Sequence, residues 1–276
     1  MKMKALIVHT FRELFAKATL YVLAGISTLV ILFVLLGLSA ETSGMGVTVL
    51  LFGKELGPPL PADKFGEFVL MMQAGFANAL YAGLVLFGVF ATAGVIPDML
   101  EKGTVDLYLS KPISRWELLL GKYFGATAVM FTNVFYFIGA LWVIIGIKLG
   151  VWNAHFILST ISLTFTFACL YSIVAFIGVL SRNTALSIIG AFLYLFVVSP
   201  LLEKRVELLF LLFKGDFSRR ILDGMYYIFP QISAMQEDLV NQIAKGDINW
   251  KPFLQSFLSG TVILLGAVGI LNKKDF

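Results

Sequence analysis

The side chains that most often carry catalysis or bind metals are sparse in this chain, and their spacing matches no catalytic motif. The two histidines, His9 and His155, lie far apart with no acidic or sulfur ligand at metal-binding spacing, and the single cysteine, Cys169, sits within an apolar run. There is no G-x-x-x-x-G-K-S/T phosphate loop, no H-E-x-x-H and no G-x-S-x-G. We therefore expect no metal, no cofactor and no catalysis, including ATP hydrolysis, by the chain itself.

Charged side chains are concentrated instead between Pro97 and Lys122. Within this segment Thr104 can cap a short helix and Pro112 would end it. Ser114, followed three residues later by Glu117, has the pattern of a capping box. The segment is therefore predicted to fold as a short helix, a proline turn and the start of a helix that enters the membrane.

The elements that position this segment are strongly apolar. Of the 276 residues, 59% are hydrophobic and 14% are charged, and the mean hydropathy is +0.90, which is outside the usual balance of a soluble protein. Uncharged runs of about twenty residues are long enough to cross a bilayer as a helix. We predict an all-α, polytopic membrane protein with six transmembrane helices. The runs lie at 18–40, between Glu67 and Asp98, Lys122 and Lys148, Lys148 and Arg182, Arg182 and Glu203, and Phe253 and Lys273.

Lysine and arginine are distributed unevenly between the two sides of the predicted bundle. The side that holds both termini carries far more of them than the opposite short loops, which places both termini in the cytoplasm. The long loop 203–252 has balanced charges on the outside and counts less. We predict a multi-pass protein of the cytoplasmic (inner) membrane. The basic residues on the side of the termini are Lys2, Lys4, Arg12, Lys17, Lys102, Lys111, Arg115, Lys122, Arg182, Lys273 and Lys274, against Lys54, Lys64 and Lys148.

Two regions outside the spans are predicted to form amphipathic helices. In residues 1–17 an apolar stripe at helical spacing indicates an interfacial helix on the cytoplasmic leaflet, which either anchors the chain or also touches a cytoplasmic partner. In the outer loop 203–252, the apolar patch 208–213 indicates a short interfacial helix, and residues 232–244 a second. This loop forms either a packed cap without a ligand or a gate for substrate. The N-terminal stripe consists of Ile7, Val8, Phe11, Leu14 and Phe15.

The segment from Pro97 to Lys122 resembles the signature of the permease subunits of ABC exporters of the type-two superfamily. In that family an acidic residue and Gly-Thr precede a leucine-rich turn, a Pro-Ile/Val-Ser-Arg turn and a Gly-Lys at the mouth of the third span. The resemblance covers essentially the whole chain and implies a single transmembrane permease domain over 1–276. The matching residues are Glu101, Gly103, Thr104, Leu107, Leu109, Lys111, Pro112, Ile113, Ser114, Arg115, Gly121 and Lys122.

The resemblance implies that residues 97–122 are a cytoplasmic coupling loop, with a coupling helix, seated in a groove of a separate ABC ATPase subunit. That partner would bind ATP and Mg, and a second permease copy or a paralogue would complete the transporter. An ordinary loop that only fixes topology is the alternative. The candidate coupling residues, which would face the ATPase or brace the loop, are Glu101, Gly103, Thr104, Lys111, Pro112 and Arg115.

Polar residues inside the predicted spans are few, and the most prominent are Gln73, Asn78 and Asn133. Such residues either line a transport pathway or join helices by hydrogen bonds, and the second role is more common. Small residues in the second span, such as Gly75 and Gly83, permit close helix packing, including at the interface of a permease dimer.

These observations favour an ATP-driven permease over other classes of protein. No aspartate, glutamate, lysine or arginine lies in the middle of a predicted span, whereas ion-coupled carriers need such groups. No basic stripe with interleaved aromatic residues indicates nucleic-acid binding, despite the net charge of +4. We predict an exporter that moves cargo by alternating access. A non-transporting scaffold or anchor for an assembly complex is the alternative, a membrane enzyme is third, and the cargo is not identified.

Overall fold

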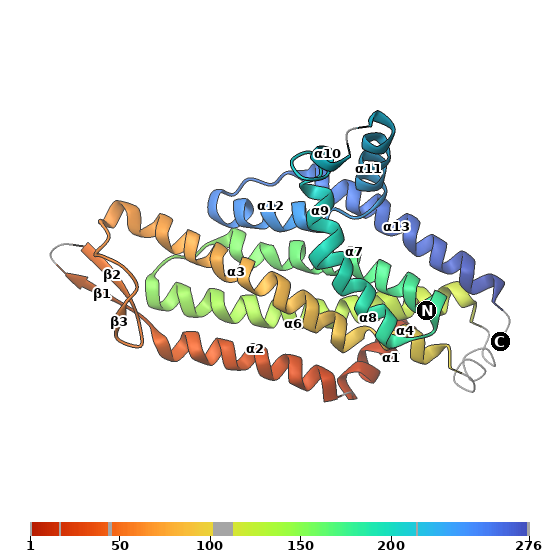
Figure 1. Cartoon of the computed structure of the whole chain (residues 1–276). Helices are drawn as coiled ribbons and strands as arrows, with labels where there is room; N and C mark the ends of the chain where they lie inside the picture. Colours follow the sequence, from red (N-terminus) through yellow and green to blue (C-terminus); the bar gives the residue numbers. More distant parts are fainter. Residues whose placement is uncertain (1, 17, 44–45, 102–112, 214, 275–276) are drawn as a thin grey trace.

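The long helices lie side by side in one bundle, and α6 (Arg115–Leu149) and α7 (Ala154–Ser181) supply much of its buried core (Figure 1). Phe137 of α6 and Tyr171 of α7 are almost fully buried. The chain is mostly helical, as the long apolar runs predict. The computed structural model describes residues 2–16, 18–43, 46–101, 113–213 and 215–274.

Five helical stretches in the described part of the chain are long and apolar enough to cross a membrane. A further helix, α3 (Ala62–Thr92), has 31 residues and runs alongside them (Figure 1). At about 1.5 Å per residue this is also enough to cross a bilayer. Its role as a sixth span stays a prediction. The five are α2 (Ala18–Gly37), α6, α7, the continuous stretch Thr184–Glu203 and α13 (Trp250–Lys273).

The stretch from Thr184 to Glu203 changes its helical geometry midway. It consists of α8 (Thr184–Leu193), the π-helical turn η1 (Tyr194–Val198) and α9 (Ser199–Glu203). Pro200 has no backbone N–H, and its ring displaces the carbonyl four residues earlier, so the helix widens before it. Accordingly, the N–H of Ser199 bonds to the carbonyl of Tyr194, five residues back.

The predicted N-terminal amphipathic helix is present as α1 (Lys2–Ala16), but its buried face differs from the predicted stripe. Leu6, Thr10 and Leu14 are buried, whereas Val8 and Phe15 of the predicted stripe are exposed. α1 packs against α6, so the shape of α6, and not hydrophobicity alone, selects the inward face. The exposed apolar side chains of Val8 and Phe15 are free to contact a leaflet, so the interfacial position of the helix stays a prediction.

A small sheet follows α2 in a chain that was expected to be entirely helical. It is an antiparallel sheet in the order β1 (Leu38–Ser43), β2 (Gly46–Leu51) and β3 (Lys54–Glu55), with Leu38 opposite Leu51. Residues 47–49 are Val-Thr-Val, and β-branched side chains favour strands. The apolar run continues to residue 40, so nothing in the sequence indicated that the helix ends at Gly37 and a strand begins. Glycine is needed at this position, because a Cβ would lie 2.5 Å from the Phe52 ring.

Residues 203–252 contain three helices, and one of them lies within the bundle. The predicted patch 208–213 contains only the single turn α10 (Leu209–Leu212), and α11 (Asp216–Ile228) follows it. α12 (Ile232–Lys245) packs against both α3 and α7, and Met235 and Leu239 are almost fully buried. This segment therefore contributes part of the bundle's core.

The two ends of the bundle differ. The sheet lies at one end, whereas α1, the short helix α4 (Val95–Met99) and the end of α13 lie at the other (Figure 1). The end of α4 and the start of α6, between which the coupling helix was predicted, also lie there (Figure 1). We refer to this as the coupling end.

Candidate functional site

The first flank of the predicted coupling loop is held tightly in the bundle. Val95, Ile96 and Met99 of α4 are buried, and the Tyr171 hydroxyl donates a hydrogen bond to the carbonyl of Thr92 at 2.9 Å, where α3 ends. The chain then reaches the surface at Glu101, which is exposed. This exposure leaves the Glu101 carboxylate available to a partner at the coupling end.

Four of the candidate coupling residues lie outside the described residues: Gly103, Thr104, Lys111 and Pro112. Their predicted roles, and the predicted coupling helix itself, stay predictions.

The second flank begins with the predicted capping box. The backbone N–H and the hydroxyl of Ser114 both donate to Glu117 Oε2, at 2.9 and 2.8 Å, and the reciprocal contact from the Glu117 backbone N–H to the Ser114 side chain is also present. This confirms the prediction from the Ser-x-x-Glu spacing. The capping box fixes the residue at which α6 begins, so the loop joins a rigid helix.

Arg115, the first residue of α6, braces the C-terminal end of the chain. Its Nη1 donates hydrogen bonds to the carbonyls of Leu271, at 3.2 Å, and Lys274. These carbonyls lie in the last turn of α13 and just beyond it, where the helix leaves acceptors without partners and where positive charge is favoured. The contacts join the start of α6 to the end of α13, and the predicted roles of Arg115, facing the ATPase or bracing the loop, stay predictions.

Lys274 extends this brace to α7. Its Nζ donates to the carbonyls of Val179 and Leu180, at 2.6 and 3.0 Å, in the last turn of α7. Partial burial, with the positive charge of Arg182 nearby, lowers the pKa of Lys274 below its ordinary value. The start of α6 and the ends of α7 and α13 are thus joined by cation-to-carbonyl hydrogen bonds at the coupling end.

A buried ion pair joins α1 to α6 immediately after the second flank. The ammonium of Lys122, only 2% exposed, contacts the carboxylate of Glu13. Gly125 allows the two helices to approach closely, because a Cβ on it would lie 2.5 Å from the Thr10 side chain. The ion pair and the close approach together hold α1 against α6, the helix that follows the predicted coupling loop.

The three polar residues predicted inside the spans do not meet at one place. On α6, Asn133 accepts a hydrogen bond from the Ser27 hydroxyl of α2 at 3.3 Å and borders a pocket of about 380 Å³. The other two, Gln73 and Asn78, lie on α3. Asn78 is hydrogen-bonded to Gln236 of α12, and Gln73 is hydrogen-bonded to Asn153, the residue before α7. Each of the three joins separate elements, and a role in a pathway stays a prediction for all of them.

α3 holds α12 through a series of hydrogen bonds along its length. Tyr81 donates to the carbonyl of Ile232 at 2.9 Å, and the Asn78 side-chain oxygen accepts from Gln236 at 2.8 Å. Gln73 accepts from the side-chain amide of Asn153 at 2.9 Å, and the same amide donates to Ile243, at the other end of α12, at 3.0 Å. The polar groups of α3 therefore position a helix of the 203–252 segment.

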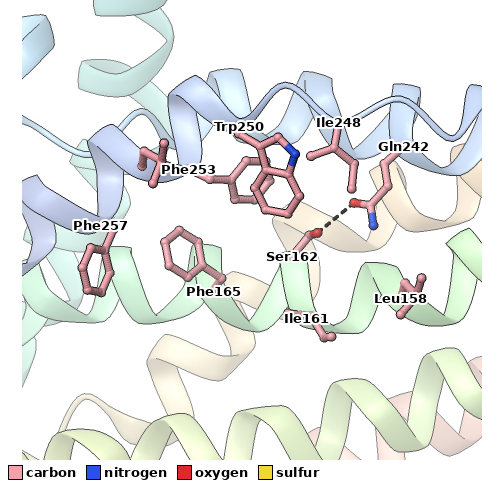
Figure 2. Close-up of a pocket in the computed structure, with 10 residues that line it drawn as sticks. Leu158, Ile161, Ser162, Phe165, Gln242, Ile248, Trp250, Phe253 and Phe257 are labelled. Carbon is pink, nitrogen blue, oxygen red and sulfur yellow. Dashed lines mark hydrogen bonds between the residues drawn. The ribbon is translucent and has the colours of Figure 1, made fainter.

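An apolar pocket of about 370 Å³ lies between α7, α12 and α13 (Figure 2). Its lining is apolar except for Ser162 and Gln242, and the Ser162 hydroxyl donates to Gln242 Oε1 at 2.7 Å. Its volume is within the range of small-molecule pockets, about 300–1,000 Å³. It contains none of the predicted site residues.

Sequence reasoning missed the residues that organise these sites. Glu13 and Gln242 were not singled out, although Glu13 lies seven residues after Leu6 and so shares the buried face of α1. That spacing could have identified Glu13, because a carboxylate on a packed face needs a partner. No pattern in the sequence identifies Gln242.

A protein-family model described as ABC-2 family transporter protein matches residues 23–275, which is nearly the whole chain. The match includes residues 23–40 of the first predicted span, all of the other predicted spans and both flanks of the predicted coupling loop. Comparison with curated proteins gave no match.

Proposed function

The chain belongs to the ABC-2 family of transporter proteins, and from that premise we propose that it is the permease subunit of an ATP-driven exporter of the cytoplasmic membrane. Family membership and the long apolar helices make it a multi-pass membrane permease of an ABC system. Export and alternating access are the proposed direction and mechanism. A separate ATPase binds ATP and Mg, because the chain has no phosphate loop.

The bracing of the coupling end is the observation that supports this mechanism. A force applied to residues 102–112 reaches α6 directly through Ser114, and reaches α13 and α7 through Arg115 and Lys274. Packed helices and hydrogen-bond networks of this kind transmit rigid-body motion. ATP-driven closure of the partner would therefore move three long helices together.

The proposed arrangement has both termini in the cytoplasm and residues 203–252 outside. Glu101 faces the ATPase, and Gly103, Thr104, Lys111 and Pro112 complete the contact. Arg115 acts as a brace for the loop. Two permeases, identical or paralogous, work with two ATPases and enclose the pathway between them.

Co-expression and co-purification with an ABC ATPase subunit test the proposal. Glu101→Lys reverses the charge of an exposed side chain at the coupling end and is expected to reduce both co-purification and ATP-driven transport. Glu41→Lys is the matched control, because Glu41 is also exposed but lies in the sheet at the opposite end.

Failure of the wild-type chain to associate with any ATPase would overturn the exporter proposal. Association without ATP-dependent movement of any cargo would favour the scaffold role. Equal losses in Glu101→Lys and Glu41→Lys would contradict the assignment of the coupling end.

A further inference from the structure

The pocket between α7, α12 and α13 contains a continuous run of aromatic rings. Trp250 packs beside Phe253 at 6.2 Å between ring centroids, and Phe165 lies 5.8 Å from Phe253 and 6.5 Å from Phe257. Figure 2 shows these rings along one part of the pocket and the Ser162–Gln242 pair beside them. A ligand that follows the pocket would meet aromatic surface over most of its length and an amide group at one place.

Gln242 presents an unused hydrogen-bond donor to this pocket. Gln242 is only 3% exposed, and its side-chain oxygen accepts a hydrogen bond from the Ser162 hydroxyl. Its nitrogen, Nε2, makes no hydrogen bond to any described residue. Because Gln242 lines the pocket, a ligand that brings a hydrogen-bond acceptor can bind this amide nitrogen.

The mouth of the pocket opens through the outer surface of membrane helices. Ile161, Leu254 and Phe257 all line the pocket and are each more than half exposed. They belong to α7 and α13, two of the stretches that are long and apolar enough to cross a membrane. The pocket is therefore reached from the hydrocarbon phase, so its ligand must partition into a bilayer.

These features exclude most classes of ligand. No charged side chain lines the pocket, so an ion or a nucleotide would lose its hydration without compensation. Two polar side chains are too few for a sugar, whose many hydroxyl groups would be left without partners. A long apolar chain that ends in a carbonyl group matches both the aromatic run and the single amide donor.

We propose that this pocket binds one ester-linked acyl lipid, with its chain along Trp250, Phe253 and Phe257 and an ester carbonyl accepting a hydrogen bond from Gln242 Nε2. The lipid joins α12 to the membrane helices α7 and α13 and so completes the packing of this part of the bundle. It comes either from the surrounding bilayer, as a resident lipid, or from the transported cargo. Binding itself does not rest on the proposed transport function.

Native mass spectrometry of the full-length chain in detergent tests the binding. The probes are phosphatidylglycerol with ester-linked chains and its ether-linked analogue with the same chain length and headgroup, which lacks only the carbonyls. We expect one tightly held ester lipid, and a Gln242→Leu variant that binds it about fivefold more weakly, the value of one neutral hydrogen bond. Gln242→Leu should leave the affinity for the ether analogue unchanged.

Two further variants separate this pocket from non-specific lipid contact. Asn241→Leu makes a similar change on an exposed neighbour in α12 that does not line the pocket, and is expected to bind like the wild type. Leu254→Trp places a larger ring at the mouth, where the exposed position tolerates it, and is expected to abolish the tightly held lipid.

Equal lipid retention by Leu254→Trp and the wild type would overturn the proposal, because the lipid would then lie elsewhere. An equal loss of ester and ether lipid in Gln242→Leu would overturn the carbonyl contact. Vesicles that contain the chain with its ATPase and a labelled ester lipid distinguish the two sources: ATP-driven movement of the label to the other leaflet identifies cargo, and retention identifies a resident lipid.

Discussion

Replacing Glu13 with glutamine should loosen α1 from the bundle at the coupling end. The substitution keeps the size of the side chain but removes the carboxylate that contacts Lys122, whose ammonium is 2% exposed. A buried charge that loses a counter-charge is strongly unfavourable, because the ammonium cannot recover its hydration. We therefore expect the open state, in which α1 has left α6, to become more populated.

The size of the effect follows from the burial of the two partners. Breaking a fully buried pair costs about 3–5 kcal/mol, and losing a hydrogen bond to a charged group about 1.5–3 kcal/mol. Because the Glu13 side chain is itself 28% exposed, we take the lower range, about 2–3 kcal/mol. At a tenfold change for each 1.4 kcal/mol, the open population rises roughly 30- to 150-fold.

Cysteine labelling measures this opening. The natural Cys169 is buried, so a Thr10→Cys background introduces a thiol at the α1–α6 interface, where Thr10 is fully buried. If closing is fast, the labelling rate follows the open population. Arg12→Gln is the matched control, because it removes one charge from an exposed position of the same helix.

A labelling rate in Glu13→Gln equal to that of the Arg12→Gln control would refute the reasoning. The double variant Glu13→Gln with Lys122→Met provides a second check. Removing both charges also removes the buried ammonium, so the double variant should label more slowly than Glu13→Gln alone. Faster labelling in the double variant would show that the ion pair does not hold α1.

Three further predictions concern other contacts. Gly125→Val should displace α1 through overpacking, at a cost of about 1–3 kcal/mol, and accelerate the same labelling, whereas Gly25→Val, where a Cβ would meet nothing within 4 Å, should not. Arg115→Gln should speed amide hydrogen exchange in residues 271–274 about tenfold, since hydrogen bonds to a charged group contribute about 1.5 kcal/mol or more; unchanged exchange would contradict the brace. Burial raises the pKa of Asp238 above its ordinary 3.8, so its ionisation opposes folding as the pH rises through this range. Asp238→Asn should therefore raise the melting temperature at pH 7 but not below pH 3.8, and an equal gain at both pH values would contradict this cause.

The sequence alone predicted the long apolar helices of a multi-pass membrane protein, because the signals for them are local in the chain. Crossing a bilayer needs about twenty uncharged residues in succession, and each of α2, α6, α7, the stretch 184–203 and α13 overlaps one of these runs over most of its length. The capping box at Ser114 was equally readable, since both of its partners lie within one helical turn. The sheet after Gly37 was missed because a short apolar stretch at the end of a long apolar run can continue the helix or form a strand, and its composition does not distinguish the two.

Only the tertiary structure decided which polar groups meet. Gln242 has the sequence context of a surface helix. In the structure it is buried in a pocket, where it accepts a hydrogen bond from Ser162, 80 residues earlier in the chain. The contact between Glu13 and Lys122 spans 109 residues, and the brace from Arg115 to Leu271 spans 156. The burial of a membrane helix depends on how many apolar residues follow one another in the chain, and this number can be read from the sequence. A hydrogen bond depends on two particular atoms within about 3 Å, and that distance is set only when the helices have packed.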